Sequence, residues 1–252
     1  EIGPVHYKSF INFVEGRAEV YGSVGNHHGG KSRVGKTLLC DEVVRATCDD
    51  GQFAVHDVMQ APIMKGWQPK YQSLQYMVQT NQEVDSVILD EIVEAYCNDI
   101  ELPPAELELI HALDLESNLN GFPGVTFIDK INRNTSMGFP WNESKRHYLI
   151  PLPANDIWQH PVDITNEVKL RMEIIEDKLR RGERACPVFS ASLKDEPVSQ
   201  AKVDNAKTRV FCAAPVDYSL VMRKYLLTFV RVLQRNKFVF EAAPGTQAQT
   251  IE

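Results

Sequence analysis

The sequence predicts an α+β fold, and three observations lead to this prediction. Two long segments, residues 166–181 and 218–236, carry apolar residues at the spacing of an amphipathic helix. Between them lie two short β-prone runs, residues 188–193 and 210–213. The polar segment that joins these runs is rich in lysine and arginine. Two helices that flank a strand pair with its connecting loop favour an α+β arrangement.

The first half of the chain is expected to begin with extended structure and to continue with helices. Residues 1–30 combine short apolar runs with a turn-rich stretch, which predicts irregular or β structure. Residues 83–97 predict a helix with one apolar and one acidic face. The apolar face would be formed by Val84, Ile88, Ile92 and Ala95 or Tyr96. A second, short acidic helix is expected near residues 104–113, and residues 118–141 predict loops.

The two long helices of the second half have signals at their ends and on their faces. The helix over residues 166–181 is expected to end at Gly182, with basic residues in its last turn. Its inward residues are predicted to be Val168, Met172, Ile175 and Leu179. The helix over residues 218–236 is expected to start at a cap formed by Asp217 or Ser219. Its inward residues are predicted to be Tyr218, Val221, Met222, Tyr225, Leu226, Phe229 and Leu233.

The composition is that of a soluble globular protein of one large domain or two small ones. Hydrophobic residues make up 43% and charged residues 24% of the chain, and no apolar run is long enough to cross a bilayer. The five cysteines form no Cys-x-x-Cys pair, which argues against a disulfide framework or a zinc ribbon and favours a reducing, cytosolic setting. Cys186 and Cys212 are expected to be small buried residues.

The charge is distributed unevenly along the chain. The net charge is −7, which by itself argues against a polyanionic partner. Residues 81–120, however, hold eleven acids and no lysine or arginine, whereas residues 194–237 hold nine bases and four acids. Such a distribution can make one channel cationic within an acidic protein. The alternative is a solvated acidic helix and a solvated basic one, and charge alone leaves both open.

The polar segment over residues 194–209 carries the strongest functional signal. Its four cations are Lys194, Lys202, Lys207 and Arg209. Pro197 and Asn205 predict that the segment stays out of regular structure. Loops held by strands at their base commonly carry binding residues, and a triphosphate requires fixed cations around its oxygens. The segment therefore predicts a site for a polyanion or a triphosphate.

A second candidate site is the turn over residues 132–141. It offers the hydroxyls of Thr135 and Ser136, and Gly138 permits the close approach of another backbone. An aromatic-Pro-aromatic sequence follows and stiffens the turn. Such a turn can hydrogen-bond a nucleic-acid backbone while its rings pack or stack. An ordinary turn with buried aromatic residues is the alternative.

A rival motif lies near the N-terminus. Gly30 to Thr37 match the Gly-x4-Gly-Lys-(Ser/Thr) pattern of a phosphate-binding P-loop. Three observations argue against a working P-loop. The preceding apolar run is separated from the motif, the acids Asp90 and Glu91 fall in a helical pattern, and the alternating βαβ pattern is absent. A P-loop ATPase or helicase fragment is retained as an alternative.

Together these segments resemble the RNA-dependent RNA polymerases of picorna-like viruses (Picornavirales), in particular those of insect and algal viruses. Residues 135–141, Thr-Ser-Met-Gly-Phe-Pro-Trp, are similar to the family's Thr-Ser-x-Gly-(Tyr/Phe)-Pro signature. Lys194-Asp195-Glu196, followed by Lys202 and by Lys207-Thr208-Arg209, resembles the basic motif of the family's fingers. The resemblance is strong over residues 118–252 and thinner before them.

The resemblance implies roles for both candidate sites. The incoming nucleoside triphosphate would be bound by Lys202 and Arg209, with assistance from Lys194 and Lys207. The template RNA backbone would be held, where the template enters, by Thr135, Ser136 and Gly138. Asp195 and Glu196 would hold the loop by pairing with its cations. Val198 stands where some members carry an additional cation, so a template contact from that position is not implied.

The same resemblance implies that the catalytic groups lie outside this chain. The family holds two Mg²⁺ ions on two aspartates, in the signatures Asp-x4-5-Asp, Ser-Gly-x3-Thr and Gly-Asp-Asp. The sequence contains no Gly-Asp-Asp and no Ser-Gly. We therefore expect the fingers region of a right-hand polymerase with an N-terminal extension, without palm and thumb. Mg²⁺ would bind in the complete enzyme, and this chain alone would be inactive.

The resemblance also sets expectations for organisation and partners. Residues 1–117 would form the N-terminal segment and part of the fingers, and residues 118–252 the fingers core. The partners would be RNA template and primer, nucleoside triphosphates, the rest of the polymerase and other viral replication proteins. The chain would be a polyprotein fragment that works in the host cytoplasm, in membrane-associated replication complexes. A non-catalytic RNA-binding module is a further alternative.

Overall fold

The computed structural model describes residues 84–244 continuously, and earlier parts of the chain in pieces. The earlier pieces are residues 2–3, 13–14, 18–19, 23–24, 31–35, 37–39, 42–43, 45–46, 59–66 and 68–77. The chain divides into two compact units. The first unit comprises residues 1–82 and 191–213, and the second comprises residues 83–190 and 214–252.

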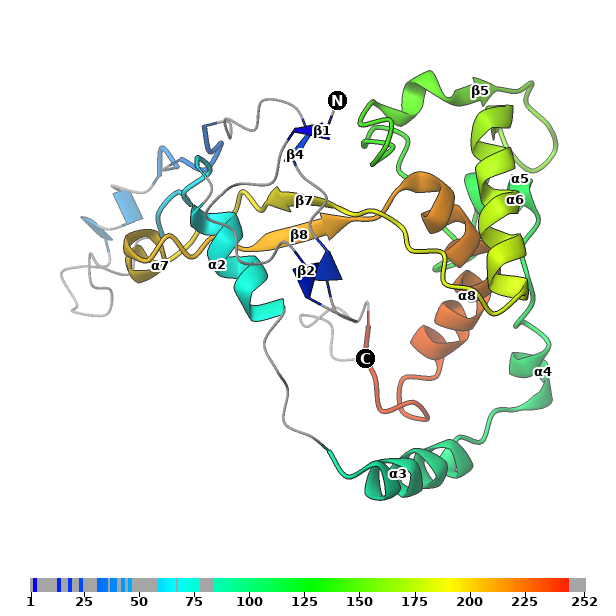
Figure 1. Ribbon diagram of the computed structural model, residues 1–252. Coiled ribbons are helices and arrows are strands. Elements are labelled where there is room, and N and C mark those ends of the chain that lie inside the picture. The colour runs from blue at the N-terminus through cyan, green and yellow to red at the C-terminus, as the bar shows by residue number, and fades with distance from the viewer. Residues whose placement is uncertain are drawn as a thin grey trace. The chain divides into compact units, whose positions relative to one another are not determined.

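In the part of the chain that the structure describes, the first unit consists of short strands and helices (Figure 1). Its elements are β1 (Ile2–Gly3), β2 (Phe13–Val14), β3 (Ala18–Glu19), β4 (Ser23–Val24), α2 (Gln68–Met77), β7 (Ser190–Leu193), α7 (Gln200–Asp204) and β8 (Val210–Ala213). β1 pairs with β4 and β2 with β3, both antiparallel, as expected for β structure within residues 1–30. The turn-rich part of that segment, residues 25–30, lies outside the described residues.

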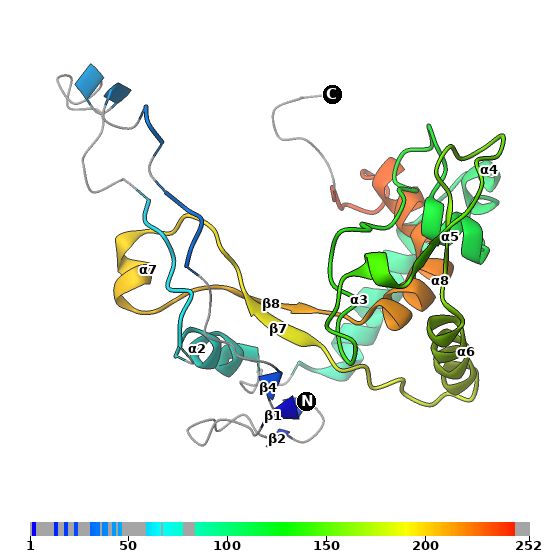
Figure 2. The same cartoon turned by 90° about the horizontal axis from the view of Figure 1, so that it is seen from above.

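The strands β7 and β8 form a two-stranded sheet, and both views show them running side by side (Figures 1 and 2). The two strands match the two β-prone runs of the sequence. The segment between them is not free of regular structure, because it contains the helix α7. The side chain of Gln200 donates to Asp204 at 2.8 Å, which links the two ends of this single turn. Asn205 then ends the helix.

The second unit is mainly helical. Its elements are α3 (Ser86–Asp99), α4 (Pro104–Leu107), α5 (Leu115–Asn120), the 3₁₀ helix η2 (Lys145–His147), β5 (Leu149–Pro151), β6 (Val162–Ile164), α6 (Asn166–Arg180) and α8 (Val216–Arg235). β5 and β6 pair antiparallel. The mixed helix and strand content of the chain agrees with the α+β prediction. The functional boundary predicted between residues 117 and 118 stays a prediction, since the compact units do not test it.

The core of the second unit lies where α8 packs against α6 and α5, and where α5 packs against β6. Its buried apolar residues are Leu119, Ile131, Met137, Val162, Ile164, Val168, Met172, Val216, Leu220 and Val221. They come from helices, from a strand and from the loops around the turn at residues 132–141. The burial of this apolar surface is the main driving force for folding of the unit.

Helix α6 closely follows its sequence signals. It spans Asn166–Arg180, and Gly182 follows with a φ of +74°. The amides of Gly182 and Glu183 donate to Leu179 and Lys178 at 3.0 and 2.9 Å, which satisfies the last carbonyls of the helix. Of the residues predicted to face inward, Val168 and Met172 are buried, as predicted. Leu179 is exposed, because it lies in the last turn beyond the reach of the core.

Helix α8 differs from its prediction in its start and in its buried face. It begins at Val216 after Pro215, and Asp217 lies inside its first turn rather than at a cap. Three residues predicted to face inward are exposed: Tyr225, Leu226 and Phe229. The buried positions of the helix are Val216, Asp217, Leu220, Val221, Thr228 and Val232. The helix carries apolar residues around much of its circumference, so periodicity alone does not identify the side that contacts α6 and α5.

The acidic segment before residue 114 forms helices, but the second is shorter than predicted. α3 spans Ser86–Asp99, and the carboxylate of Asp85 caps it by accepting the amide of Val87 at 2.9 Å. Every residue of α3 is exposed. α4 ends at Leu107 because the following backbone binds α8 instead. His111 exchanges hydrogen bonds with the hydroxyl of Thr228, donating at 3.2 Å and accepting at 2.7 Å.

The two cysteines predicted to be buried, Cys186 and Cys212, are both exposed. Cys186 follows the end of α6 in a segment that leaves the helix with a φ of +47° at this residue. Cys212 lies on β8, whose central residues are exposed in the two-stranded sheet. A sheet of two strands buries too little surface to hide both of its faces.

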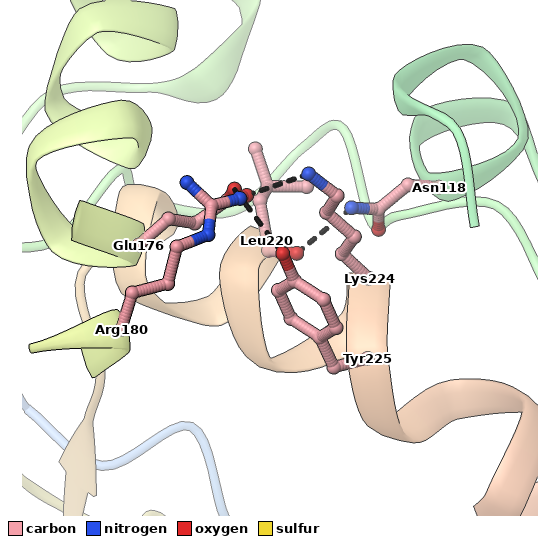
Figure 3. A network of polar contacts seen from close by, with 6 residues as sticks. All are labelled: Asn118, Glu176, Arg180, Leu220, Lys224 and Tyr225. Atoms are coloured by element: carbon pink, nitrogen blue, oxygen red, sulfur yellow. Dashed lines mark hydrogen bonds and ion pairs between the residues drawn. The ribbon is translucent and has the colours of Figure 1, made fainter. Parts of the chain in front are cut away.

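A buried carboxylate joins α6 to α8 (Figure 3). The side chain of Glu176 is 9% exposed and accepts from Lys224 at 2.8 Å, and from Arg180 and Tyr225 at 3.2 Å. The hydrogen bond to Glu176 raises the pKa of Lys224. On the other side of α8, the amide of Asn118 donates to the carbonyl of Leu220 at 2.8 Å. The buried acid is therefore fully partnered, as a charge in this position must be.

Replacing Glu176 with alanine should lower the free energy of unfolding of the second unit by about 2–4 kcal/mol, because three donors lose a buried acceptor. Urea unfolding followed by the fluorescence of Trp141 and Trp158 measures this change. Glu173→Ala is the matched control, since Glu173 is an exposed residue of the same helix. Its effect should be about 0.5 kcal/mol or less. Equal losses in both variants would contradict the role given to Glu176.

Candidate functional site

The four cations of the segment over residues 194–209 lie around one loop of the first unit. The two strands hold its ends, and the amide of Lys194 donates to the carbonyl of Arg209 at 2.8 Å, which closes the base. Lys202 lies on α7, and Lys207 follows that helix. All four side chains belong to exposed residues. The structure therefore places the predicted nucleotide-binding cations on a single loop.

Glu196 binds the two cations at the base of the loop. Nε and Nη2 of Arg209 donate to the two oxygens of this carboxylate, so the pair is bidentate. Nζ of Lys194 lies 3.2 Å from Oε2 of the same side chain. The hydrogen bonds from Arg209, and then those from Lys194, lower the pKa of Glu196 to about 2. The pairing predicted for Glu196 is confirmed, and it fixes the orientation of the guanidinium group.

Asp195 has different partners from those predicted. Its oxygens accept the hydroxyl of Ser32 and, at 2.7 Å, the amide of Arg33. These two hydrogen bonds lower the pKa of Asp195, the one from Ser32 contributing most. Asp195 therefore ties the loop to the segment at residues 31–35 rather than to the cations of the loop.

The same contact bears on the P-loop alternative. Residues 31–35 have no helical or turn structure, and the hydroxyl of Ser32 donates a hydrogen bond to the carboxylate of Asp195. A P-loop instead wraps its amides around a phosphate, which a neighbouring carboxylate would repel. Gly30 and Lys36 of this motif lie outside the described residues. Asp90 and Glu91 lie on α3, as the helical period predicted, and the P-loop hypothesis gains no support.

Residues 59–66 bind the loop from its other side. Gln60 and Val198 exchange backbone hydrogen bonds of 2.7 and 2.9 Å. The buried hydroxyl of Thr208 donates to the carbonyl of Ile63 at 2.9 Å. Val198 is 4% exposed, so the position where some resembling polymerases carry a cation is a packing position in this chain. Hydrogen bonds to the main chain of residues 59–66 thus hold the loop, and the four cations of the loop remain exposed.

The turn over residues 132–141 is anchored at its centre in the second unit. Met137 is fully buried, and its amide donates to Glu143 at 2.7 Å, while its carbonyl accepts the amide of Val216 at 2.8 Å. The hydroxyl of Ser136 accepts the amide of Gly138 at 3.1 Å. The residues on the outer side of the turn, Thr135 and Ser136, are exposed. The turn therefore presents two hydroxyls on a fixed backbone.

Gly138 is buried and cannot carry a side chain without displacing the start of α8. Its φ is +78°, and a Cβ atom would lie 2.8 Å from Cα of Pro215. The close approach that requires glycine is therefore made by the chain's own backbone. The peptide bond between Phe139 and Pro140 is cis. A contact of Gly138 with template RNA stays a prediction.

Two cations beside the turn were not singled out by the sequence analysis. Nζ of Lys145 donates to the hydroxyl of Thr135 at 2.5 Å, and burial lowers the pKa of Lys145. The guanidinium of Arg146 donates twice to the side chain of Asn134, at 2.9 and 2.6 Å. The run Lys145-Arg146-His147, shortly after the turn, was the available signal. The antiparallel bridge between Ser136 and Ser144 brings this run to the outer side of the turn.

The residue types gathered on the loop and beside the turn are those that suit anion binding. The hydroxyls and most of the cations lie at exposed positions, and Lys145 is half-buried; cations beside hydroxyls suit phosphate oxygens. Among the residues described, no group of three or more His, Cys, Asp or Glu side chains is arranged to hold a metal ion. Within the described part of the chain, no helix is long and apolar enough to span a membrane. The loop belongs to the first compact unit and the turn to the second.

Comparison with known proteins identifies relatives over most of the chain. The sequence model of viral RNA-dependent RNA polymerases matches residues 51–248. The replicase polyprotein of acute bee paralysis virus (strain Rothamsted) is 32% identical over 146 residues, which are 55% of this chain and 7% of that protein. The replicase polyprotein of Drosophila C virus (strain EB) is 34% identical over 142 residues, or 53% of this chain and 8% of that protein.

A plant-virus protein and a solved structure add to these similarities. The RNA1 polyprotein of cowpea mosaic virus (strain SB) is 28% identical over 211 residues, or 75% of this chain and 10% of that protein. The solved Sicinivirus 3Dpol RNA dependent RNA polymerase matches 78% of this chain and 39% of its own length, with a TM-score of 0.60 and 20% identity. This likeness concerns the fold. The chain thus spans a small part of the curated relatives.

The pair between Glu196 and Arg209 should show a defined pH dependence. The pKa of Glu196 is depressed from 4.5 to about 2. The pair therefore stabilises the loop fully above about pH 4.5, and this stabilisation is lost as the pH falls toward 2. The carboxyl ¹³C shift of Glu196, followed by NMR against pH, measures the titration.

Arg209→Gln should raise the midpoint of this titration toward the ordinary glutamate value, because the bidentate partner is lost. Lys202→Gln is the control, since it removes a charge from the same loop without touching Glu196. A midpoint near the ordinary value in the unsubstituted chain would show that the pair does not form.

Proposed function

The chain belongs to the viral RNA-dependent RNA polymerase family, and on this basis we propose that it forms the fingers and N-terminal segment of such an enzyme. The complete polymerase adds nucleotides to an RNA 3′ end as directed by an RNA template. The observation that carries the proposal is the loop at residues 194–209, where a carboxylate orients an arginine among three exposed lysines. The fold likeness to a solved polymerase supports it.

The loop is proposed to bind the triphosphate of the incoming nucleotide through Lys194, Lys202, Lys207 and Arg209. The guanidinium of Arg209 uses Nε and Nη2 to bind Glu196, and its Nη1 has no partner among the described residues. A phosphate oxygen can therefore bind Nη1 without breaking the pair with Glu196. The lysines act as point charges on movable stems, which suits a ligand that enters and leaves in each cycle.

The turn is proposed to hold the template backbone through Thr135, Ser136 and Gly138. Lys145 and Arg146 lie beside these groups and supply positive charge for a phosphate. Contacts of this kind position a nucleic-acid strand without selecting its sequence, which a replicating enzyme requires. Because Nζ of Lys145 donates to the hydroxyl of Thr135, the ammonium group and the hydroxyl lie next to each other. Both can then contact one phosphate group of the template.

The metal chemistry is proposed to lie in the part of the polymerase outside this chain. Enzymes of this family use divalent metal ions, and Mg²⁺ would stabilise the charge that develops on the transferred phosphate. The described residues offer no fitting ligand set, so no step of the reaction is assigned to them. We propose that palm and thumb are supplied by the rest of the polymerase. We also propose that the enzyme works in the host cytoplasm, in membrane-associated replication complexes with other viral replication proteins.

Arg209→Ala in the complete polymerase should reduce kcat/KM for nucleotides by about 5- to 150-fold, the equivalent of about 1–3 kcal/mol for a lost charged hydrogen bond. Primer extension at varied nucleotide concentration measures this ratio. Arg209→Ala also leaves the carboxylate of Glu196 without this partner, and that carboxylate could repel the phosphate. The double variant Glu196→Gln/Arg209→Ala removes the negative charge and therefore measures the loss of the cation alone. Arg184→Ala, which removes an exposed cation outside the loop, is the control. An unchanged nucleotide dependence in Arg209→Ala would remove Arg209 from the site.

Thr135→Ala should weaken template binding by about 0.5–1.5 kcal/mol and leave the KM for nucleotides unchanged, because the hydroxyl proposed to contact the template is lost, together with its hydrogen bonds to Lys145 and Asn132. Primer extension at varied template concentration, with saturating nucleotide, measures the template term. Thr135→Ser keeps the hydroxyl and should bind template normally. If Thr135→Ala altered only the nucleotide term, the turn would not be where the template enters.

A further inference from the structure

A pocket of about 240 Å³ lies in the second unit, outside both the cationic loop and the turn. Its walls come from α6, from residues 185–188 after that helix, from the start of α8 and from the ring of Phe139. All of these residues belong to the same compact unit. The volume is somewhat below the roughly 300–1,000 Å³ of sites for drug-sized ligands, so a single-ring molecule is the fitting size.

The walls of the pocket are largely apolar and include two aromatic rings. Ile174, Ile175 and Val188 supply branched aliphatic surface, and Phe139 and Tyr218 supply the rings. The ring of Tyr218 is held by an edge contact with Phe189 at 6.3 Å. Aromatic walls favour an aromatic ligand, because rings gain from edge and offset contacts in addition to burial.

The charged groups that line the pocket leave a net positive charge. They are Arg171, Lys178 and Asp217. The buried carboxylate of Asp217 accepts Nε of Arg171 at 2.7 Å and the amide of Tyr218 at 2.7 Å, so both of its oxygens are engaged. The amino groups of Arg171 and the ammonium of Lys178 make no hydrogen bond within the described part of the chain, although Arg171 also stacks on Trp141 at 4.9 Å.

We propose that this pocket binds a small aromatic carboxylate. The ring would lie against the apolar and aromatic walls, and the carboxylate would bind the amino groups of Arg171 and the ammonium of Lys178. Arg171 is already oriented by Asp217 and Trp141, so binding would cost little ordering of its side chain. The proposal does not depend on the polymerase function.

Cys186 makes occupancy of the pocket measurable, because its exposed thiol is part of the wall. Benzoate in the pocket should slow the exchange of this thiol with a neutral pyridyl disulfide. In that exchange the Cys186 thiolate attacks the disulfide, a mixed disulfide forms and the pyridine thiolate leaves. Replacing Cys40, Cys48, Cys97 and Cys212 with serine in the full chain leaves Cys186 as the reporter.

Benzoate should protect Cys186 with a dissociation constant of about 1 mM, the scale for a ligand of this size. Benzamide, which has the same shape without the charge, should protect at least about tenfold less. Lys178→Gln should weaken protection by about tenfold, because a charge-assisted hydrogen bond is lost. Arg184→Gln removes a nearby cation that does not line the pocket, and should leave protection unchanged.

Three results would overturn the proposal. Benzoate fails to protect Cys186, or benzamide protects equally well, or benzoate protects equally a variant in which the thiol of Cys97 on α3 is the reporter. If the cysteine variants do not fold, methyl NMR of the unsubstituted chain replaces the exchange assay. Benzoate should then shift the methyl signals of Ile175 and Val188 and leave those of Ile92 on α3 in place; unchanged signals at Ile175 and Val188 would also overturn the proposal.

Discussion

The first turn of α8 is the constraint on which most of the second unit depends. The amide of Val216 donates to the carbonyl of Met137, and the backbone of Pro215 packs so closely on Gly138 that it leaves no room for a Cβ atom there. One residue later, the buried carboxylate of Asp217 accepts Arg171 of α6. A single turn of helix thus fixes the turn at residues 132–141, the direction of α6 and one wall of the pocket. A substitution that disturbs the first helical turn of α8 would therefore alter the turn at residues 132–141, the direction of α6 and the pocket together.

The loop of the first unit solves a different physical problem, which is to hold several cations together without a deep core. Main-chain bonds from residues 59–66 satisfy the buried face of the loop, and Asp195 ties it to residues 31–35. Glu196 then offsets the repulsion between Lys194 and Arg209. Glu196 therefore acts as an internal counter-ion, and all four cations of the loop remain at exposed positions. The net negative charge of the whole chain says little about this local field.

Sequence reasoning identified the helices with strong end signals and the family, because both depend on local patterns. Gly182 ended α6 as predicted, and Asp90 and Glu91 lay on a helix as predicted. The predictions were wrong where tertiary contacts determine the structure. One case is the buried face of α8, and another is the early end of α4, where the backbone that follows the helix is hydrogen-bonded to Thr228. Lys145 was missed because its importance depends on the bridge that brings it to Thr135, and no local pattern encodes that distance.

The packing of Gly138 changes how sequence comparisons of this turn should be interpreted. A glycine kept unchanged across related proteins is often taken as the mark of a contact with ligand. In this fold any side chain would meet the backbone of Pro215, so natural selection would keep the glycine even if no RNA ever approached it. Invariance at this position would therefore reflect the requirements of folding, and only the neighbouring exposed hydroxyls would carry an evolutionary record of function.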